Sequence, residues 1–369
     1  MVGLAREALL VMLLVGIAGV TFAASLGARA ALVEGVGEIA APGWPGQLCV
    51  FGPKAEAVVV GKMGDAQAPV VAAAQLGAGR LVLFGHDGYF GREALETGDT
   101  GRLLLNSLHW ASGKPSPRAL VVEWPEIVDW LREQGLVAID STFAGYPALL
   151  SQADVVLTHH NWLAGEAGRQ VSAFVKAGGG LISGDTPWGW LQLNPGKNLL
   201  TDHPGNAVVA EAGVVWADGG LDRTSEAGFN ANLEPSPYVN ASTALDALLG
   251  NTTLSEEEQK QVGSTLTTAA RGLPESDTLL RPRLKVLEAE ADSIPSPDHP
   301  LTLDNPKGRL ALTLKLEELN RLPLDQRPAH PSAAFFPGAV PNDAPRVEKT
   351  ILVDTTVPNW HSTGLYAAP

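Results

Sequence analysis

The sequence predicts an α/β protein built on a parallel sheet with covering helices. In residues 118–218, short apolar runs alternate with amphipathic stretches, a pattern typical of strands buried on both faces between crossover helices. The preceding residues 33–113 carry mainly strand patterns, and residues 241–322 carry helical ones. With 369 residues, of which 45% are hydrophobic and 18% charged, the chain can bury sizeable cores.

Residues 31–113 are expected to form a β-rich subdomain packed on that sheet. Glycine- and proline-bounded apolar runs predict strands at residues 48–51, 57–60, 70–74 and 81–84. Glycines within residues 76–80 suit a hairpin loop between the last two strands, because glycine accepts a positive φ. A helix should follow, with Asp99 or Thr100 at its N-cap and Gly113 beyond its end.

Residues 114–222 form the predicted α/β domain. Helices are expected at residues 126–134 and 165–177, and strands at residues 119–122, 137–140, 154–158 and 181–183. Ligand sites in parallel sheets lie at the carboxyl ends of the strands. Two such ends carry polar and aromatic side chains, residues 158–162 and 184–190.

Residues 223–330 are expected to form a helical region. Ser255 and Glu258 have the spacing of a capping box, and residues 276–292 have helical apolar spacing that Pro282 interrupts. Residues 307–321 predict another helix, and residues 350–353 a strand.

The amino terminus resembles an export signal. Residues 8–28 are uncharged and follow Arg6, and small residues at positions 28–30 fit a cleavage site, with an earlier cut at Ala23. A cleaved signal peptide over residues 1–30 is therefore expected, and a secreted or periplasmic protein. The alternatives are a membrane anchor formed by residues 8–28 and a buried helix.

Charge and cysteine content exclude several classes of function. The formal net charge of −14, with 26 Lys and Arg against 40 Asp and Glu, argues against a nucleic-acid partner. The single cysteine, Cys49, excludes an intrachain disulfide and any multi-cysteine metal site. Because Cys49 lies in an apolar strand run, we expect a buried structural thiol.

No complete catalytic set is present, so the sequence leaves enzyme status open. None of the eight histidines starts a His-Glu-x-x-His motif, and no cysteine occupies a strand–helix elbow. Ser183 lacks the Gly-x-Ser-x-Gly spacing. His159 and His160 are candidate metal ligands, but neighbouring side chains at a strand end usually diverge and no third ligand is evident nearby. We therefore expect a capping or pocket-rim role, and no metal.

Two further segments complete the candidate site. His86 and Asp87 follow a strand and predict either a turn closed by the Asp side chain or a pocket rim. The tryptophans of residues 187–194 predict a loop that stacks on sugar rings or packs a joint between domains. The candidate pocket comprises His86, Asp87, His159, His160, Asp185, Trp188, Trp190 and Asn194.

Several segments, in order, resemble the amino-terminal module of TRPM-channel-associated factors and their bacterial relatives. They are Trp44-Pro45-Gly46, residues 84–89, residues 174–182 and Pro204-Gly205-Asn206, and the resemblance spans residues 33–218. It implies a glutamine-amidotransferase-like fold without the catalytic cysteine. His203 stands where this family more often has Phe, and Asp185 replaces its usual small or amide residue.

Residues 336–338 and 358–367 resemble the opening of an enhancin-like (family M-60) metallopeptidase domain, so residues 331–369 are expected to be its truncated start. Bacterial members act on mucin-type glycoproteins. The resemblance implies an exported, non-catalytic accessory region, with a glycan or glycoprotein as partner. It implies no cofactor in this chain, because zinc would belong to the missing peptidase domain.

Two alternatives remain open, a carbohydrate- or surface-binding module and an amidotransferase-like hydrolase. Convergence of His86, His159 and Asp185 would favour the hydrolase. Exposed, coplanar Trp188 and Trp190 would favour the binding module.

Overall fold

A computed structural model describes residues 27–292 except 200, 251 and 275. Four expectations fall outside the described residues: the export signal up to residue 26, the helix at residues 307–321, the strand at residues 350–353 and the peptidase-like segment 331–369. No helix in the described part of the chain is both long and apolar enough to cross a lipid bilayer.

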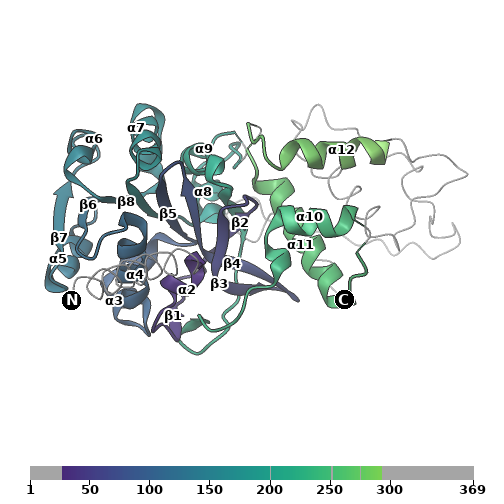
Figure 1. The fold of residues 1–369 in the computed structure, drawn as a ribbon, viewed down its shortest axis with the longest axis horizontal. Coiled ribbons are helices and arrows are strands. Elements are labelled where there is room, and N and C mark those ends of the chain that lie inside the picture. Colours follow the sequence, from purple (N-terminus) through teal and green to yellow (C-terminus); the bar gives the residue numbers. More distant parts are fainter. Residues whose placement is uncertain (1–26, 200, 251, 275, 293–369) are drawn as a thin grey trace, which may run out of the picture.

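A seven-stranded sheet forms the centre of the molecule (Figure 1), with the strand order β3-β4-β5-β9-β8-β6-β7. The pairs β5·β9, β9·β8, β8·β6 and β6·β7 are parallel, whereas β3·β4 and β4·β5 are antiparallel. The strand bounds are β3 Ala55–Met63, β4 Ala66–Leu76, β5 Gly79–Phe84, β6 Arg118–Val122, β7 Val137–Ser141, β8 Val155–His159 and β9 Gly180–Gly184. The prediction that the strands near residues 137, 155 and 181 share one sheet is confirmed.

The expected β-rich subdomain packed on the sheet needs correction, because β3, β4 and β5 belong to the same sheet as the parallel strands. The reason lies in β5, whose side chains are buried on both faces: Leu81 and Leu83 enter one hydrophobic cluster, and Val82 and Phe84 enter another. A strand covered on both faces is typical of the inside of an α/β sheet, and β5 lies there between β4 and β9. The predicted hairpin between β4 and β5 is confirmed, with Gly77 at a φ of 61°.

Two shorter sheets lie beside the large one. Strand β2 (Gly46–Val50) pairs with β10 (Val214–Gly220), and β1 (Glu38–Ala40) pairs with β11 (Gly228–Asn230), both antiparallel. The β2–β10 ribbon packs against one face of the large sheet, where Leu48, Val50 and Trp216 join the same cluster as Leu81 and Leu83.

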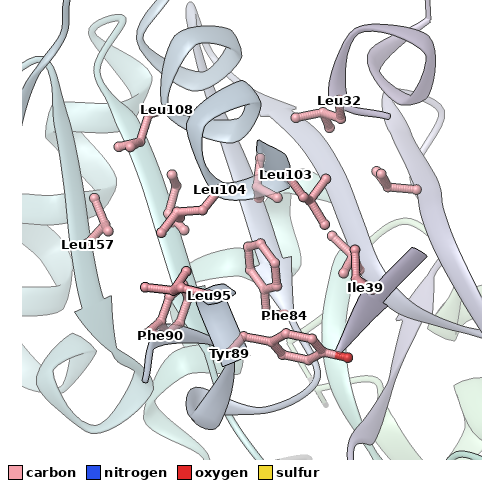
Figure 2. Close-up of a cluster of buried hydrophobic side chains, with 14 of the residues drawn as sticks. Leu32, Ile39, Phe84, Tyr89, Phe90, Leu95, Leu103, Leu104, Leu108 and Leu157 are labelled. Atoms are coloured by element: carbon pink, nitrogen blue, oxygen red, sulfur yellow. The ribbon is translucent and has the colours of Figure 1, made fainter. Parts of the chain in front are cut away.

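Helices cover both faces of the sheet. On one face, Leu103, Leu104 and Leu108 of α4 pack over Phe84 in the cluster of Figure 2. That face is covered by α2 (Ala28–Leu32), α3 (Arg92–Glu96), α4 (Thr100–Ser112) and α5 (Pro125–Glu133). The other face is covered by α6 (Tyr146–Leu149), α7 (Gly165–Lys176) and α9 (Pro204–Val209). The predicted start and end of α4 are confirmed, with Gly113 at a φ of 66°.

The predicted helical region comprises α10 (Ala241–Leu249), α11 (Glu256–Gly272) and α12 (Arg281–Asp292), gathered at the end of the molecule away from β7 (Figure 1). The capping box of Ser255 and Glu258 is confirmed. The expectation for residues 276–292 is corrected, because the helix starts only at Arg281. Pro282 then lies in the first turn, where its missing N–H costs no hydrogen bond.

Candidate functional site

The carboxyl ends of β5, β9 and β8 lie side by side at one edge of the sheet. Phe84 of β5 and His159 of β8 both pair with Gly184 of β9. The residues that end or follow these three strands therefore meet, as expected for a parallel sheet. They supply five of the eight predicted pocket residues: His86, Asp87, His159, His160 and Asp185.

His159 and His160 do not diverge, contrary to the expectation from strand geometry. Their ring centroids are 4.1 Å apart. Strand β8 ends at His159, and a 3-10 helix (η3, His160–Leu163) begins at the next residue, so the alternation of side chains stops between them. The Nδ1 of His159 accepts the Asn161 N–H at 3.2 Å, which turns its Nε2 toward Asp87.

Asp185 lies between two imidazoles, and the three side chains form what we call the floor of the site. Its Oδ1 is 2.7 Å from Nδ1 of His160, and its Oδ2 is 2.8 Å from Nε2 of His203. His160, Asp185 and His203 are only 2%, 3% and 2% exposed. The sequence placed Asp185 in the candidate pocket but did not predict its contacts with His160 and His203.

The two contacts of Asp185 differ in kind. His203 accepts the Asn206 N–H at Nδ1, so in the neutral ring its Nε2 carries the proton and donates it to Asp185. The contact from His160 lacks hydrogen-bond geometry, and neither ring nitrogen of His160 has a hydrogen-bond partner among the described residues.

The charges of the floor follow from burial and these contacts. Burial raises the pKa of Asp185, but the interactions with His160 and His203 outweigh it and hold that pKa well below the ordinary range. Burial lowers the pKa of His160 to about 4, although Asp185 partly offsets it. At neutral pH the floor therefore contains a carboxylate beside a neutral His160 ring.

His86, Asp87 and His159 are partly exposed and form the rim above the floor. Asp87 lies 2.9 Å from Nδ1 of His86 and 3.4 Å from Nε2 of His159. Burial raises the pKa of Asp87, but its interactions with His159 and His86 lower it by more, so Asp87 is a carboxylate at neutral pH. The expected turn occurs, but His86 rather than Asp87 closes it, by accepting the Gly88 N–H at 2.8 Å.

The predicted tryptophan loop is a helix, α8 (Pro187–Leu193), and it separates Trp188 from Trp190. Residues two apart on a helix point about 200° away from each other. Trp190 is therefore buried, at 7% exposure, edge-on to His203 at 5.0 Å. The exposed coplanar pair of Trp188 and Trp190 does not form.

Trp188 instead packs against Trp44, which sequence analysis did not place in the site. The ring centroids are 5.8 Å apart, and the indole N–H of Trp188 donates to the Trp44 carbonyl at 2.9 Å. Trp44 is 49% exposed. Its neighbour Gly43 touches the rim, because a Cβ on Gly43 would lie 3.0 Å from Nε2 of His86.

Asn194 is a structural residue rather than part of the rim or the floor. Its side-chain amide donates to the Trp190 carbonyl at 2.9 Å and closes the end of α8. Sequence reasoning missed His203, although its place directly before Pro204 at the start of α9 was a signal for an N-cap. It also missed Trp216, which is fully buried and lies 5.8 Å from His203.

The nucleophiles considered from sequence do not serve this site. Cys49 is buried in β2, as expected, and its burial raises the pKa of the thiol to about 12, with Asp277 adding to the effect. Ser183 is buried within β9, where its hydroxyl donates to the Thr158 carbonyl at 2.6 Å. The strand–helix junction after β9 carries Asp185 instead of a cysteine.

The family model described as "TRPM8, N-terminal domain" matches residues 20–226, a range that contains the whole rim and floor. TRPM8 channel-associated factor 2 of Bos taurus is 30% identical over 174 residues, which are 47% of this chain and 18% of that protein. TRPM8 channel-associated factor 1 of Homo sapiens is 31% identical over 209 residues, which are 54% of this chain and 21% of that protein. The chain thus spans about a fifth of the length of the curated relatives it matches.

Solved structures with a related arrangement include the IMPa metallopeptidase from Pseudomonas aeruginosa. That structure is 15% identical with a TM-score of 0.44, covering 79% of this chain and 33% of the other. IMPa in complex with an O-glycopeptide is 14% identical with a TM-score of 0.40, over the same shares of the two chains.

Proposed function

Because the chain belongs to the family of the "TRPM8, N-terminal domain", we propose that it is a non-catalytic accessory region of a larger exported protein. In this proposal the larger protein is an enhancin-like (M-60) zinc metallopeptidase, and the accessory region binds the carbohydrate of its glycoprotein substrates. Two observations support an accessory role: the family model describes an amino-terminal domain, and the chain corresponds to about a fifth of its relatives. The resemblance of residues 358–367 to the opening of a peptidase domain supports the choice of enzyme.

The proposal of carbohydrate binding depends mainly on one observation, the exposed Trp44 next to the polar rim. An indole face provides a rigid apolar surface for the C–H face of a sugar ring. The neighbouring carboxylate of Asp87 accepts hydrogen bonds from hydroxyl groups, and the imidazoles of His86 and His159 can donate or accept. Gly43 precedes Trp44 and lies against His86, so one ligand can reach both the indole face and the polar side chains of the rim.

The structure offers less support for the hydrolase alternative. His86 and His159 converge on Asp87, whereas Asp185 contacts His160 and His203, so the expected convergence of His86, His159 and Asp185 is divided between rim and floor. A nucleophilic mechanism would also need an activated side chain, and Cys49, with its raised pKa, is a neutral thiol at neutral pH.

Calorimetric titration of the full chain with a mucin-type O-glycopeptide tests the proposal, with the unglycosylated peptide as ligand control. We expect Trp44→Ala to weaken glycopeptide binding about tenfold, as loss of one aromatic contact should. Leu193→Ala is the matched control, because Leu193 is a large apolar side chain that is 84% exposed outside the rim. Equal affinities for the two peptides would refute carbohydrate recognition, and cleavage of the glycopeptide by this chain would favour the hydrolase instead.

A further inference from the structure

Three side chains at the carboxyl edge bring metal-ligating atoms together. One ligand atom from each of His159, His160 and Asp185 lies within 4.8 Å of the other two. Two imidazole nitrogens and one carboxylate oxygen are a ligand set that first-row transition metals accept. His159 ends β8, and His160 and Asp185 directly follow β8 and β9, whose parallel register brings these strand ends together.

The buried ring of His160 points to a ligand, because its Nε2 has no hydrogen-bond partner within the described ranges and its Nδ1 meets Asp185 at 2.7 Å without hydrogen-bond geometry. His160 is 2% exposed, and neither of its ring nitrogens has a hydrogen-bond partner in the part of the chain that the structure describes. A buried polar group without a partner costs about 1–3 kcal/mol. A cation bound to one ring nitrogen would provide the missing partner for that atom.

The contact between His160 and Asp185 is shorter than the separation of two ligands on one ion, so the pair must open to bind one. Nδ1 and Oδ1 are 2.7 Å apart without hydrogen-bond geometry between them. Two ligands about 2.1 Å from a tetrahedral Zn²⁺ ion lie about 3.4 Å apart. A small opening of the pair would therefore admit the ion.

A supporting shell holds the carboxylate in position. His203 donates to Oδ2 of Asp185 at 2.8 Å, and Oδ1 faces Nδ1 of His160 at 2.7 Å, where the ion would bind. Such outer hydrogen bonds orient the ligands of protein metal sites. The partly exposed rim of His86, Asp87 and His159 lies above the floor and provides a route for the ion to enter.

We propose that His159, His160 and Asp185 bind a divalent first-row transition metal ion of the Zn²⁺ class. With three protein ligands, the ion keeps coordination positions open toward the rim. Coordination through Nε2 of His159 places the ring proton on Nδ1, so Asn161 gives up its 3.2 Å hydrogen bond to that atom. His159 is also one of the imidazoles offered to the carbohydrate, but His160 and Asp185 take no part in that proposal, so the two proposals are tested separately.

The test is titration of the untagged, EDTA-stripped full chain with Zn²⁺ by calorimetry, and with Co²⁺ by visible absorption. We expect one ion per chain at this site. Asp185→Asn and His159→Ala should each weaken binding about 100-fold, because each removes a ligand. His109→Ala is the matched control, since His109 is exposed on α4 and should leave binding unchanged.

Circular dichroism of each metal-free variant shows whether it is folded. If Asp185→Asn does not fold, His159→Ala decides the question, because its side chain is partly exposed in the rim. Wild-type affinity in a folded ligand variant, or no binding of either metal to the folded wild type, would overturn the proposal. Glycopeptide binding by the metal-free chain is measured in parallel, so that either proposal can fail without the other.

Discussion

Asn206 binds both backbone polar groups of Trp216. Its amide oxygen accepts the Trp216 N–H at 2.8 Å, and its amide nitrogen donates to the Trp216 carbonyl at 2.9 Å. The side chain thus joins α9 to β10 as a neighbouring strand would. Since His203 starts α9 and accepts the Asn206 N–H, this pair of bonds also positions His203 against Asp185.

Asn206→Ala should therefore destabilise the protein strongly. The substitution leaves the buried N–H and carbonyl of Trp216 without these partners, at a combined cost of about 2–4 kcal/mol. Urea unfolding should show a lower midpoint. Asn194→Ala is the control, because it removes one part-buried hydrogen bond at the end of α8 and should cost about 1 kcal/mol or less. Equal midpoints for the two variants would contradict this role of Asn206.

Gly213 and Gly196 have the same φ of +82° but different surroundings, so they form a matched pair. A Cβ at Gly213 would lie within van der Waals overlap of the Gly52 backbone, whereas one at Gly196 would meet nothing within 4 Å. We expect Gly196→Ala to cost about 1–2 kcal/mol for the left-handed backbone alone. Gly213→Ala should cost about 1–3 kcal/mol more, because β2 and β10 must move apart.

Thermal unfolding of the two glycine variants, side by side, measures this difference. If both variants lost a similar melting temperature, the close contact between Gly52 and Gly213 would add nothing to the destabilisation caused by a left-handed alanine.

Cys49 should resist alkylation in the folded protein. Burial raises the pKa of its thiol from an ordinary 9.0 to about 12, so at pH 8.5 the reactive thiolate is scarce and inaccessible. Mass spectrometry after iodoacetamide should show no adduct in buffer and one in urea, because Cys49 is the only cysteine. Rapid modification without denaturant would refute the buried thiol.

The raised pKa of Cys49 also predicts that the protein loses stability at alkaline pH. Between about pH 9 and pH 12 the unfolded thiol ionises while the folded one keeps its proton, so the raised pKa favours unfolding as the pH rises. The wild type should lose stability relative to Cys49→Ala across this range, and the difference should be constant below it.

We propose that the chain is exported and that its mature amino terminus lies before Gly27. Arg29 contacts Glu234 at 2.7 Å and donates to the carbonyls of Ala231 and Leu233, and Leu32 is fully buried, so α2 is part of the folded core. Cleavage after Ala30 would remove Arg29, whereas cleavage after Ala23 would retain it. Amino-terminal sequencing of the exported protein checks this, and a mature terminus at Ala31 would contradict it.

Local patterns predicted most elements because they depend on neighbours in the sequence. The helix α4 has both of its ends marked in the sequence, and the hairpin of β4 and β5 follows from its glycines. The same local patterns suggested a β-rich subdomain. They contain no information on which distant strand pairs with β5. That pairing, with β9, joins segments that the whole β6–β8 region separates.

By itself, the sequence determined the α/β class, the common sheet of the strands near residues 137, 155 and 181, the buried Cys49 and the strand ends that carry polar side chains. Only the tertiary structure decided that Asp185 lies between His160 and His203, and that Trp188 packs against Trp44 instead of Trp190. Periodicity fixes where a side chain points relative to its own helix or strand. The distance between side chains on different elements depends on strand order, register and the turn after each strand, which involve residues far apart in the chain.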